Sequence, residues 1–171
     1  TVYAGEYFGN PERASVNVWR IPLEGQQPPS VAYSFAEASI RHIHAVKYNR
    51  AEDRFYVLTG DLDPECSIMA FDREFNEPVI VGSGDETYRA IVCEFFEDGF
   101  LYVTDAEHMH NRVYRVVDGE RIEIGLGDGP VFYSLKTNAG VLLSSVYEGC
   151  PSQSGNSACL YLYTDTDRKL E

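Results

Sequence analysis

Short runs of apolar and β-branched residues, bounded by turns rich in Gly, Asn and Asp, recur along the whole chain. Long stretches with the 3.6-residue period of an amphipathic helix are missing from the sequence. The clearest stretch contains four such runs, at 44–48, 55–59, 67–71 and 79–81. Val, Ile, Tyr and Phe dominate these runs, as expected for strands that pack on a pleated surface. The pattern predicts an all-β protein built from short antiparallel strands.

The four-strand unit repeats about every 44 residues. Ala45 precedes Thr59 by 14 positions, and Ala90 precedes Thr104 by the same number. A third copy contains the run 140–145, and the first residues of the chain match the end of an earlier copy. A repeat of this length with four strands is typical of a β-propeller blade, and an all-β sandwich with accidental similarity is the alternative.

We expect a single partial β-propeller domain over residues 1–171, with blades at about 1–36, 40–82, 88–125 and 131–171. The first blade has room for three strands, and the last has little room for a fourth strand after 158–163. Because the first blade lacks an inner strand and the last lacks an outer one, the two cannot complete each other. We therefore expect a ring of roughly six to eight blades, completed by a missing segment or a second chain, since open blade faces would expose apolar surface.

The charge balance excludes several partners. The 171 residues include 27 Asp and Glu but only 14 Lys and Arg, which gives a net charge of −13. Nucleic-acid binding requires a basic face, so it is not expected. Apolar runs nowhere approach the roughly 20 residues of a transmembrane helix, so no membrane span is expected either.

Polar residues gather where the first two strands of a propeller blade approach the central axis. One acid follows the second strand of each copy, and cationic, imidazole and phenol groups precede or begin the first strands. These positions are Glu6, Asp61, Asp105, Glu148, Arg41, His42, His44, Tyr88, Arg89 and Tyr133, with Asp63 close by. We expect an axial site for a polar ligand here. The alternative is that the acids only accept backbone N–H groups in turns.

All four histidines fall in two His-x-His pairs, His42 with His44 and His108 with His110. Residues i and i+2 of a strand share a face, so His42 and His44 could hold one divalent metal ion together. Zinc would suit the imidazoles, and calcium would suit the neighbouring carboxylates. The alternative is that the histidines only form hydrogen bonds, with the second pair in an exposed loop.

Four cysteines give a weaker indication of cellular location. Cys150 and Cys159 bracket a polar loop, and a disulfide closing it would contribute about 2–3 kcal/mol. Such a bridge predicts an oxidising location, extracellular or in the cell envelope. Two thiols are the alternative. Cys93 fits a core position, whereas Cys66 lies in a loop and could be reactive.

The motifs resemble the sialidase-like, BNR-repeat β-propeller superfamily with degenerate Asp boxes. The resemblance is carried by Arg41-His42-Ile43-His44-Ala45-Val46, Thr59-Gly60-Asp61-Leu62-Asp63-Pro64-Glu65, Tyr88-Arg89-Ala90 and Thr104-Asp105. It implies a propeller with a glycan ligand. Propeller polysaccharide lyases are a second resemblance, since they use His, Tyr and Arg near the axis.

Two classes of function follow from these expectations. A carbohydrate-active or carbohydrate-binding propeller would use Asp61 and Asp105 as a carboxylate pair if it is a glycoside hydrolase. As a lyase it would use Arg89 to neutralise a sugar carboxylate, and His44 or Tyr133 as base. The alternative is a non-catalytic propeller that acts as a protein-interaction or metal-binding assembly module.

Overall fold

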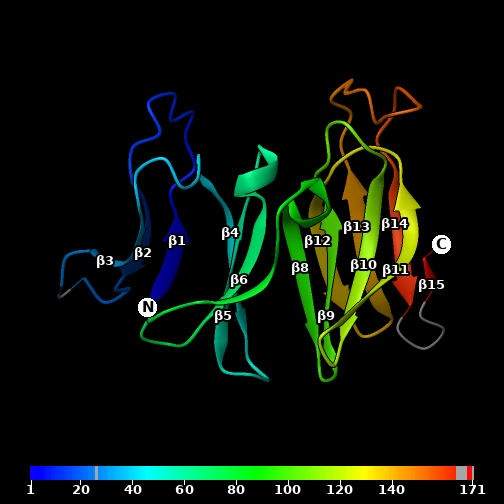
Figure 1. The fold of residues 1–171 in the computed structure, drawn as a ribbon. Helices are drawn as coiled ribbons and strands as arrows, with labels where there is room; N and C mark the ends of the chain where they lie inside the picture. The colour runs from blue at the N-terminus through cyan, green and yellow to red at the C-terminus, as the bar shows by residue number, and fades with distance from the viewer. Residues whose placement is uncertain (26, 165–168, 171) are drawn as a thin grey trace. The chain divides into compact units, whose positions relative to one another are not determined.

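The computed structural model describes residues 1–25, 27–164 and 169–170. These residues form an all-β structure of short antiparallel strands, with two single-turn 3-10 helices at Asp63–Glu65 and Glu86–Tyr88 (Figure 1). No helix within this part of the chain has the length and hydropathy needed to cross a membrane.

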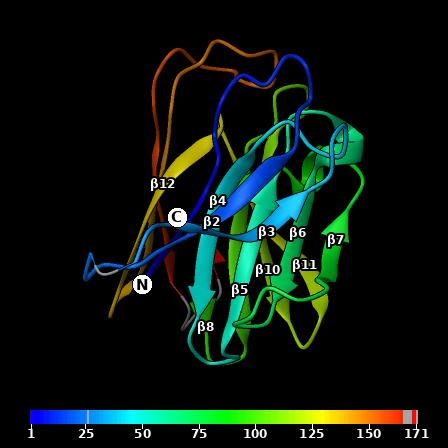
Figure 2. The same ribbon diagram turned by 90° about the vertical axis from the view of Figure 1, so that its left-hand side faces the viewer.

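The chain divides into two compact units, Thr1–Arg89 and Ala90–Glu171. The first unit contains a three-stranded and a four-stranded sheet, and Figure 2 shows the four-stranded one with its strands side by side. The three-stranded sheet has the order β1 (Val2–Gly5), β2 (Val16–Ile21), β3 (Ser30–Phe35). The four-stranded sheet has the order β4 (Ile43–Asn49), β5 (Arg54–Thr59), β6 (Ser67–Phe71), β7 (Val79–Ser83).

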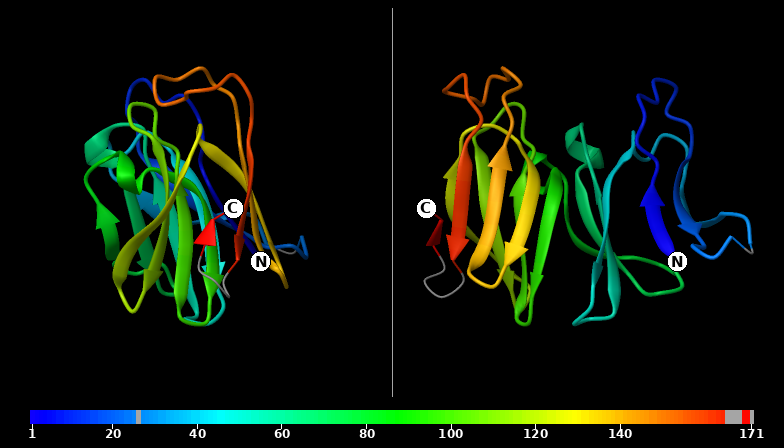
Figure 3. Two further views of the ribbon diagram at one scale, coloured as in Figure 1. Left: turned by 90° about the vertical axis from the view of Figure 1, so that its right-hand side faces the viewer. Right: turned by 180° about the vertical axis from the view of Figure 1, so that it is seen from behind.

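The second unit contains two four-stranded sheets, and the right-hand view of Figure 3 shows β12 to β14 side by side. One sheet has the order β8 (Ala90–Phe96), β9 (Gly99–Thr104), β10 (Asn111–Val117), β11 (Glu120–Gly127). The other has the order β12 (Val131–Thr137), β13 (Gly140–Ser145), β14 (Leu160–Thr164), β15 (Lys169–Leu170). The expected three-stranded first sheet and two four-stranded sheets are present, whereas the last sheet has a two-residue fourth strand, β15, for which the sequence left little room.

Apolar side chains that alternate along the strands form a core in each unit. In the first unit, Val18 and Val57 are fully buried between the two sheets, together with Phe71. In the second unit, Leu143 and Tyr163 are fully buried in the corresponding place. Burying such side chains is the main stabilising contribution to the fold, at about 1.5–3 kcal/mol for each large one.

Every first strand of a four-stranded sheet contains a β-bulge near its start. The residue just before each bulge lies opposite the end of the second strand, in the pairs Ile43–Thr59, Ala90–Thr104 and Val131–Ser145. These pairs align the copies without reference to sequence similarity. The bulged positions are then His44, Ile91 and Phe132.

This register corrects the alignment expected from the sequence. Ala45 lies opposite Leu58, whereas Ala90 lies opposite Thr104. The reason is hairpin length: residues 50–53 connect β4 to β5, but only residues 97–98 connect β8 to β9. Equal spacing in the sequence therefore hid a shift of two positions within the first strand.

The four acids stand at different distances from the ends of the second strands. Asp61 comes two residues after the end of β5, Asp105 one residue after the end of β9, and Glu148 three residues after the end of β13. Glu6 still follows the pairing of β1, since its backbone N–H donates to the carbonyl of Asn17. One acid therefore follows the second strand of each copy, but its distance from the strand end varies from one to three residues.

Candidate functional site

Five of the predicted site residues meet around the carboxylate of Asp61 in the first unit. Arg41 Nη1 lies 3.0 Å from Asp61 Oδ2, and Arg89 Nη2 lies 3.5 Å from Oδ1. His42 Nε2 and His44 Nε2 each lie 3.4 Å from the same Oδ1 atom. We call this group the Asp61 cluster.

The backbone after β5 is shaped to allow this convergence. A β-carbon on Gly60 would lie only 2.8 Å from Cγ of Arg89 and 2.8 Å from Cε1 of His44, so the absence of a side chain lets both groups approach. Asp61 itself has a φ of 94°, a conformation that L residues rarely adopt. Strained backbone of this kind concentrates at functional sites.

The two histidines reach the cluster from the start of β4. His44 occupies the β-bulge, and its Nε2 atom lies 3.1 Å from Nε2 of His42. On the other side of its ring, His42 Nδ1 lies 3.1 Å from the carbonyl oxygen of Phe8. A carbonyl can only accept, so Nδ1 carries a proton, and Nε2 is the ring nitrogen that faces the cluster.

The surroundings keep Asp61 ionised. The contacts with His42 and then His44, together with the positive charge of Arg89, hold the pKa of the Asp61 carboxyl far below its usual value despite partial burial. Asp61 therefore carries a full negative charge near neutral pH. The side chain of His44 is only 1% exposed, whereas that of Arg41 is 43% exposed, so Arg41 gives the cluster its outer surface.

A supporting layer positions Arg41, and the sequence did not reveal it. Glu65 accepts the backbone N–H of Arg41 at 3.0 Å and pairs with Arg13 at 2.5 Å. The buried Asn10 donates to the carbonyl of Arg41 at 2.9 Å. Arg13 and Asn10 come from the β1–β2 loop, so their distance along the sequence gave no sign of the contact.

Tyr7 covers part of the cluster and was also not predicted as a site residue. Its ring centroid lies 4.2 Å from that of His42 and 6.1 Å from that of His44. The residue is 68% exposed, which leaves much of the ring at the surface.

Glu6, which was predicted to bind ligand, has a structural role instead. Its carboxylate accepts the indole N–H of Trp19 at 2.7 Å and the backbone N–H of Asn17 at 2.8 Å. Burial acts to raise the pKa of Glu6, but the hydrogen bonds from Trp19 and Asn17 outweigh it and lower the pKa. These contacts correct the prediction because they fix the carboxylate on β2.

Asp63 and Tyr88 also lie outside the Asp61 cluster. Asp63 is exposed at the start of the first 3-10 helix. The ring of Tyr88 lies over Gly82 of β7, where any side chain would overlap it. Among the described residues, the group of three or more potential metal ligands consists of His42, His44 and Asp61, without Asp63.

The remaining predicted residues belong to the second unit. Asp105 is buried, Tyr133 is 65% exposed, and Glu148 is exposed with its backbone N–H donating to Gln153. Their role in an axial site stays a prediction.

The cysteines do not behave as the sequence suggested. Cys150 and Cys159 are thiols rather than a disulfide. The Cys150 sulfur lies 3.1 Å from the Ser152 hydroxyl, while the Cys159 backbone N–H donates to the Ser145 hydroxyl. The expected bridge is therefore absent from this structure, while the extracellular or cell-envelope location stays a prediction. Cys66 is fully buried, and burial raises the pKa of its thiol to about 12, so the expected reactivity is wrong.

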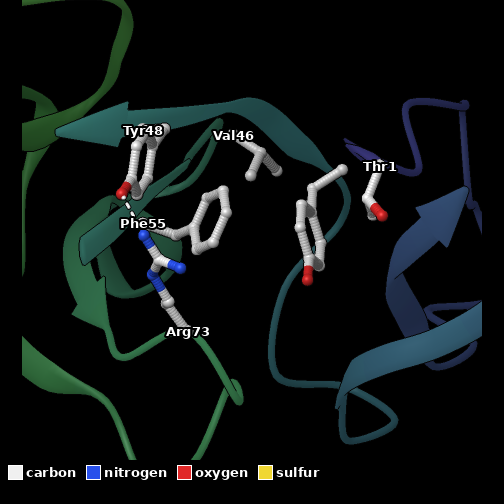
Figure 4. Close-up of a pocket in the computed structure, with 6 residues that line it drawn as sticks. Thr1, Val46, Tyr48, Phe55 and Arg73 are labelled. Carbon is white, nitrogen blue, oxygen red and sulfur yellow. Dashed lines mark hydrogen bonds between the residues drawn. The ribbon is translucent and has the colours of Figure 1, made fainter. Parts of the chain in front are cut away.

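A separate pocket of about 510 Å³ lies against β1 and β4 in the first unit (Figure 4). Its walls include the rings of Tyr3, Tyr48 and Phe55, and Arg73 donates to the Tyr48 hydroxyl at 3.1 Å. This pocket shares none of its lining residues with the Asp61 cluster.

Comparison with known proteins supports the fold and not the activity. The chain matches no family model and no curated protein. Among solved structures it is similar to TolB from Acinetobacter baumannii, with a TM-score of 0.68 and 12% sequence identity. The match covers 99% of this chain and 40% of that chain. TolB is a β-propeller of a different type from the sialidase-like proteins, so the sialidase-like resemblance stays a prediction. The likeness shows a propeller-like, all-β fold.

Proposed function

We propose that the Asp61 cluster binds a carboxylate-bearing sugar, as part of a carbohydrate-binding or carbohydrate-active propeller. The observation that carries this proposal is the pair of arginines directed at one carboxylate, beside the exposed ring of Tyr7. A guanidinium group is well suited to bidentate recognition of a carboxylate. An aromatic ring beside such a polar group is a common arrangement in ligand sites.

Arg41 retains donors for a ligand. Arginine has five N–H groups, and this residue donates Nε to the Gly9 carbonyl and Nη1 to Asp61. Its side chain is 43% exposed, so the other N–H groups are accessible to an anion. Arg41 and Arg89 carry two positive charges and Asp61 carries one negative charge, so these three side chains have a net charge of +1. This local positive charge would attract an anion to a protein whose net charge is −13.

Catalysis is a further step of this proposal. In a lyase, Arg89 would neutralise the sugar carboxylate, and His44 or Tyr133 would take the proton. In a hydrolase, Asp61 and Asp105 would share the acid and base roles. The burial of His44 disfavours it as a base for an external substrate, so the contacts favour binding, and a non-catalytic binding module is the second candidate.

Calorimetric titration of the chain with galacturonate oligomers and with neutral galactose oligomers tests the proposal. We expect the acidic sugar to bind more tightly, and Arg41→Ala to weaken its binding about 10-fold to 100-fold, as for loss of a hydrogen bond to a charged group. Arg41→Lys keeps the charge without the fork and should bind at an intermediate level. Arg73→Ala removes an exposed arginine that pairs with Asp53, outside the cluster, and serves as the matched control. Equal binding of both sugars, or unchanged binding by Arg41→Ala, would contradict the proposal.

We also propose that the four sheets belong to a larger ring of roughly six to eight blades. The chain spans 40% of the length of the TolB chain, and among the described strands β1 pairs only with β2. In the register of the sheets, Val46 and Tyr48 of β4 occupy the same positions as Ser134 and Lys136 of β12. Within the second unit, Ser134 and Lys136 form hydrogen bonds with the inner strand of the preceding sheet, at Glu94 and Phe95 of β8.

The pocket beside Val46 and Tyr48 is therefore where an inner strand paired with β1 would lie. A missing segment or a second chain would supply it. The intact mass of the native polypeptide and its sedimentation in solution test this. A native protein of 19.2 kDa that sediments as a monomer refutes the larger ring.

A further inference from the structure

We infer that His42 Nε2, His44 Nε2 and Asp61 Oδ1 form the protein face of a divalent transition-metal site, with zinc as the best-fitting ion. The site is part of the Asp61 cluster. The inference deepens the proposed function, and in that respect rests on it, because the ion would offer the sugar carboxylate a direct ligand position.

The three atoms have the spacing that a small ion requires. They form a triangle with edges of 3.1, 3.4 and 3.4 Å. The point in its plane that is equidistant from all three lies about 1.9 Å from each, just inside the roughly 2.0–2.1 Å of bonds from zinc to nitrogen or oxygen. An ion slightly out of this plane therefore reaches all three atoms at normal bond lengths without any movement of the side chains.

The hydrogen-bond chemistry of the triangle also calls for a cation. His42 donates through Nδ1 to the Phe8 carbonyl, so Nε2 is the ring atom left to face an ion, and Asp61 adds a carboxylate oxygen on the same side. A proton on His44 Nε2 lies 3.1 Å from His42 Nε2 and 3.4 Å from Asp61 Oδ1, so it can serve one of the two atoms well but not both. A metal ion would accept all three lone pairs at once.

The outer contacts are those of a metal-binding histidine. His42 donates its other ring N–H to the carbonyl of Phe8, which fixes both the tautomer and the ring orientation. Metal-ligating histidines almost always make such a second contact. Two imidazoles and one carboxylate suit zinc and similar ions, whereas calcium takes six to eight oxygen ligands.

Three protein ligands leave a position for water or an anion. Arg41 and Arg89 both contact Asp61, and their charges lower the affinity for a cation. An anionic ligand offsets this repulsion, so metal and sugar carboxylate should each raise the affinity for the other by the same factor. The reciprocity itself is a thermodynamic necessity, and the charges of the ion and the two arginines set the sign and size of the coupling.

Titration of the 171-residue chain with Co²⁺, followed by absorption, and with Zn²⁺, followed by calorimetry, tests the inference. We expect one ion per chain, cobalt bands without a sulfur-to-cobalt charge-transfer band, and a loss of affinity of at least about 100-fold in His44→Ala and in Asp61→Asn. The double variant His108→Ala/His110→Ala removes the second His-x-His pair, which lies in an exposed loop and takes part in no group of three ligands among the described residues, so it should bind like the wild type.

Two measurements keep the test decisive. Zinc-induced shifts of the His42 and His44 ring nitrogens, followed by NMR in the wild-type chain, identify the ligands even where a variant fails to fold. Absence of binding, shifts confined to His108 and His110, or unchanged affinity in a folded His44→Ala variant overturns the inference. Sugar binding that survives a chelator and depends on Arg41 overturns the metal site and retains the proposed function. Metal binding without sugar binding retains the metal site and overturns the proposed function.

Discussion

Gly60→Ala is the substitution that most directly tests how the Asp61 cluster is built. The added methyl group would lie 2.8 Å from Cγ of Arg89 and 2.8 Å from Cε1 of His44. Carbon atoms in favourable contact are about 3.5–4.0 Å apart, so each neighbour must move by about 0.7 Å or more. The φ of Gly60 lies outside the left-handed region, so the backbone itself accepts alanine.

The displacement of His44 sets the expected size of the effect. Metal–ligand distances tolerate only about 0.2 Å of change, so the shift should reduce zinc affinity about 10-fold to 100-fold. Overpacking costs about 1–3 kcal/mol of stability, and the lower entropy of the unfolded alanine chain returns about 0.4–1 kcal/mol. We therefore expect a small net loss of stability together with a large loss of binding.

Gly9→Ala is the matched control, because a β-carbon there would meet no atom within 4 Å. Zinc calorimetry gives the affinity of both variants, and urea denaturation gives their stability. Wild-type affinity in a folded Gly60→Ala variant would refute the argument that the missing side chain admits His44 to the cluster. An equal loss of affinity in Gly9→Ala would refute its specificity.

Three other predictions concern stability and reactivity. Asp98→Ala removes the carboxylate partner of Arg115, whose side chain is 1% exposed, and should lower the unfolding free energy by about 1–3 kcal/mol in urea denaturation; an unchanged midpoint would contradict this. Iodoacetamide at pH 8 should label Cys66 far more slowly than the partly exposed Cys150, because the raised pKa of Cys66 leaves little thiolate; equal rates by peptide mass spectrometry would count against it. The lowered pKa of Glu6 stabilises the fold fully above the ordinary pKa of 4.5, and this contribution is lost as the pH falls through the folded pKa. Glu6→Gln should therefore flatten the acid side of the stability–pH curve, and an unaltered curve would speak against this role.

The strands were predictable because each one depends on local sequence. Alternating apolar residues and turn-forming Gly, Asn and Asp mark a strand and its end within a few positions, and four such runs per copy gave the sheets. The His42–His44 pair was visible as a motif, but regular strand geometry does not explain their contact, because His42 precedes β4 and His44 occupies its β-bulge.

The register between strands was not local. The β4–β5 hairpin is two residues longer than the β8–β9 hairpin, and this alone shifts the pairing of the first strand by two positions, since both copies carry the same β-bulge. The spacing from Ala45 to Thr59 equals that from Ala90 to Thr104 despite this shift, so the two alanines were aligned although they pair with different positions of the second strand. Pairing between backbones determines the register, and similar residues at similar spacing do not reveal it.

The sequence by itself determined the all-β architecture, the repeat and the residue types available for a site, because these depend on side-chain chemistry and short-range periodicity. The tertiary structure alone decided which acid meets the histidines, that Glu6 bonds to Trp19 instead, and that the Phe8 carbonyl fixes the His42 tautomer. Those choices depend on contacts between segments tens of residues apart, whose distances are set by how sheets pack and how loops return. Local pattern constrains each segment separately, and only packing brings particular atoms within bonding distance.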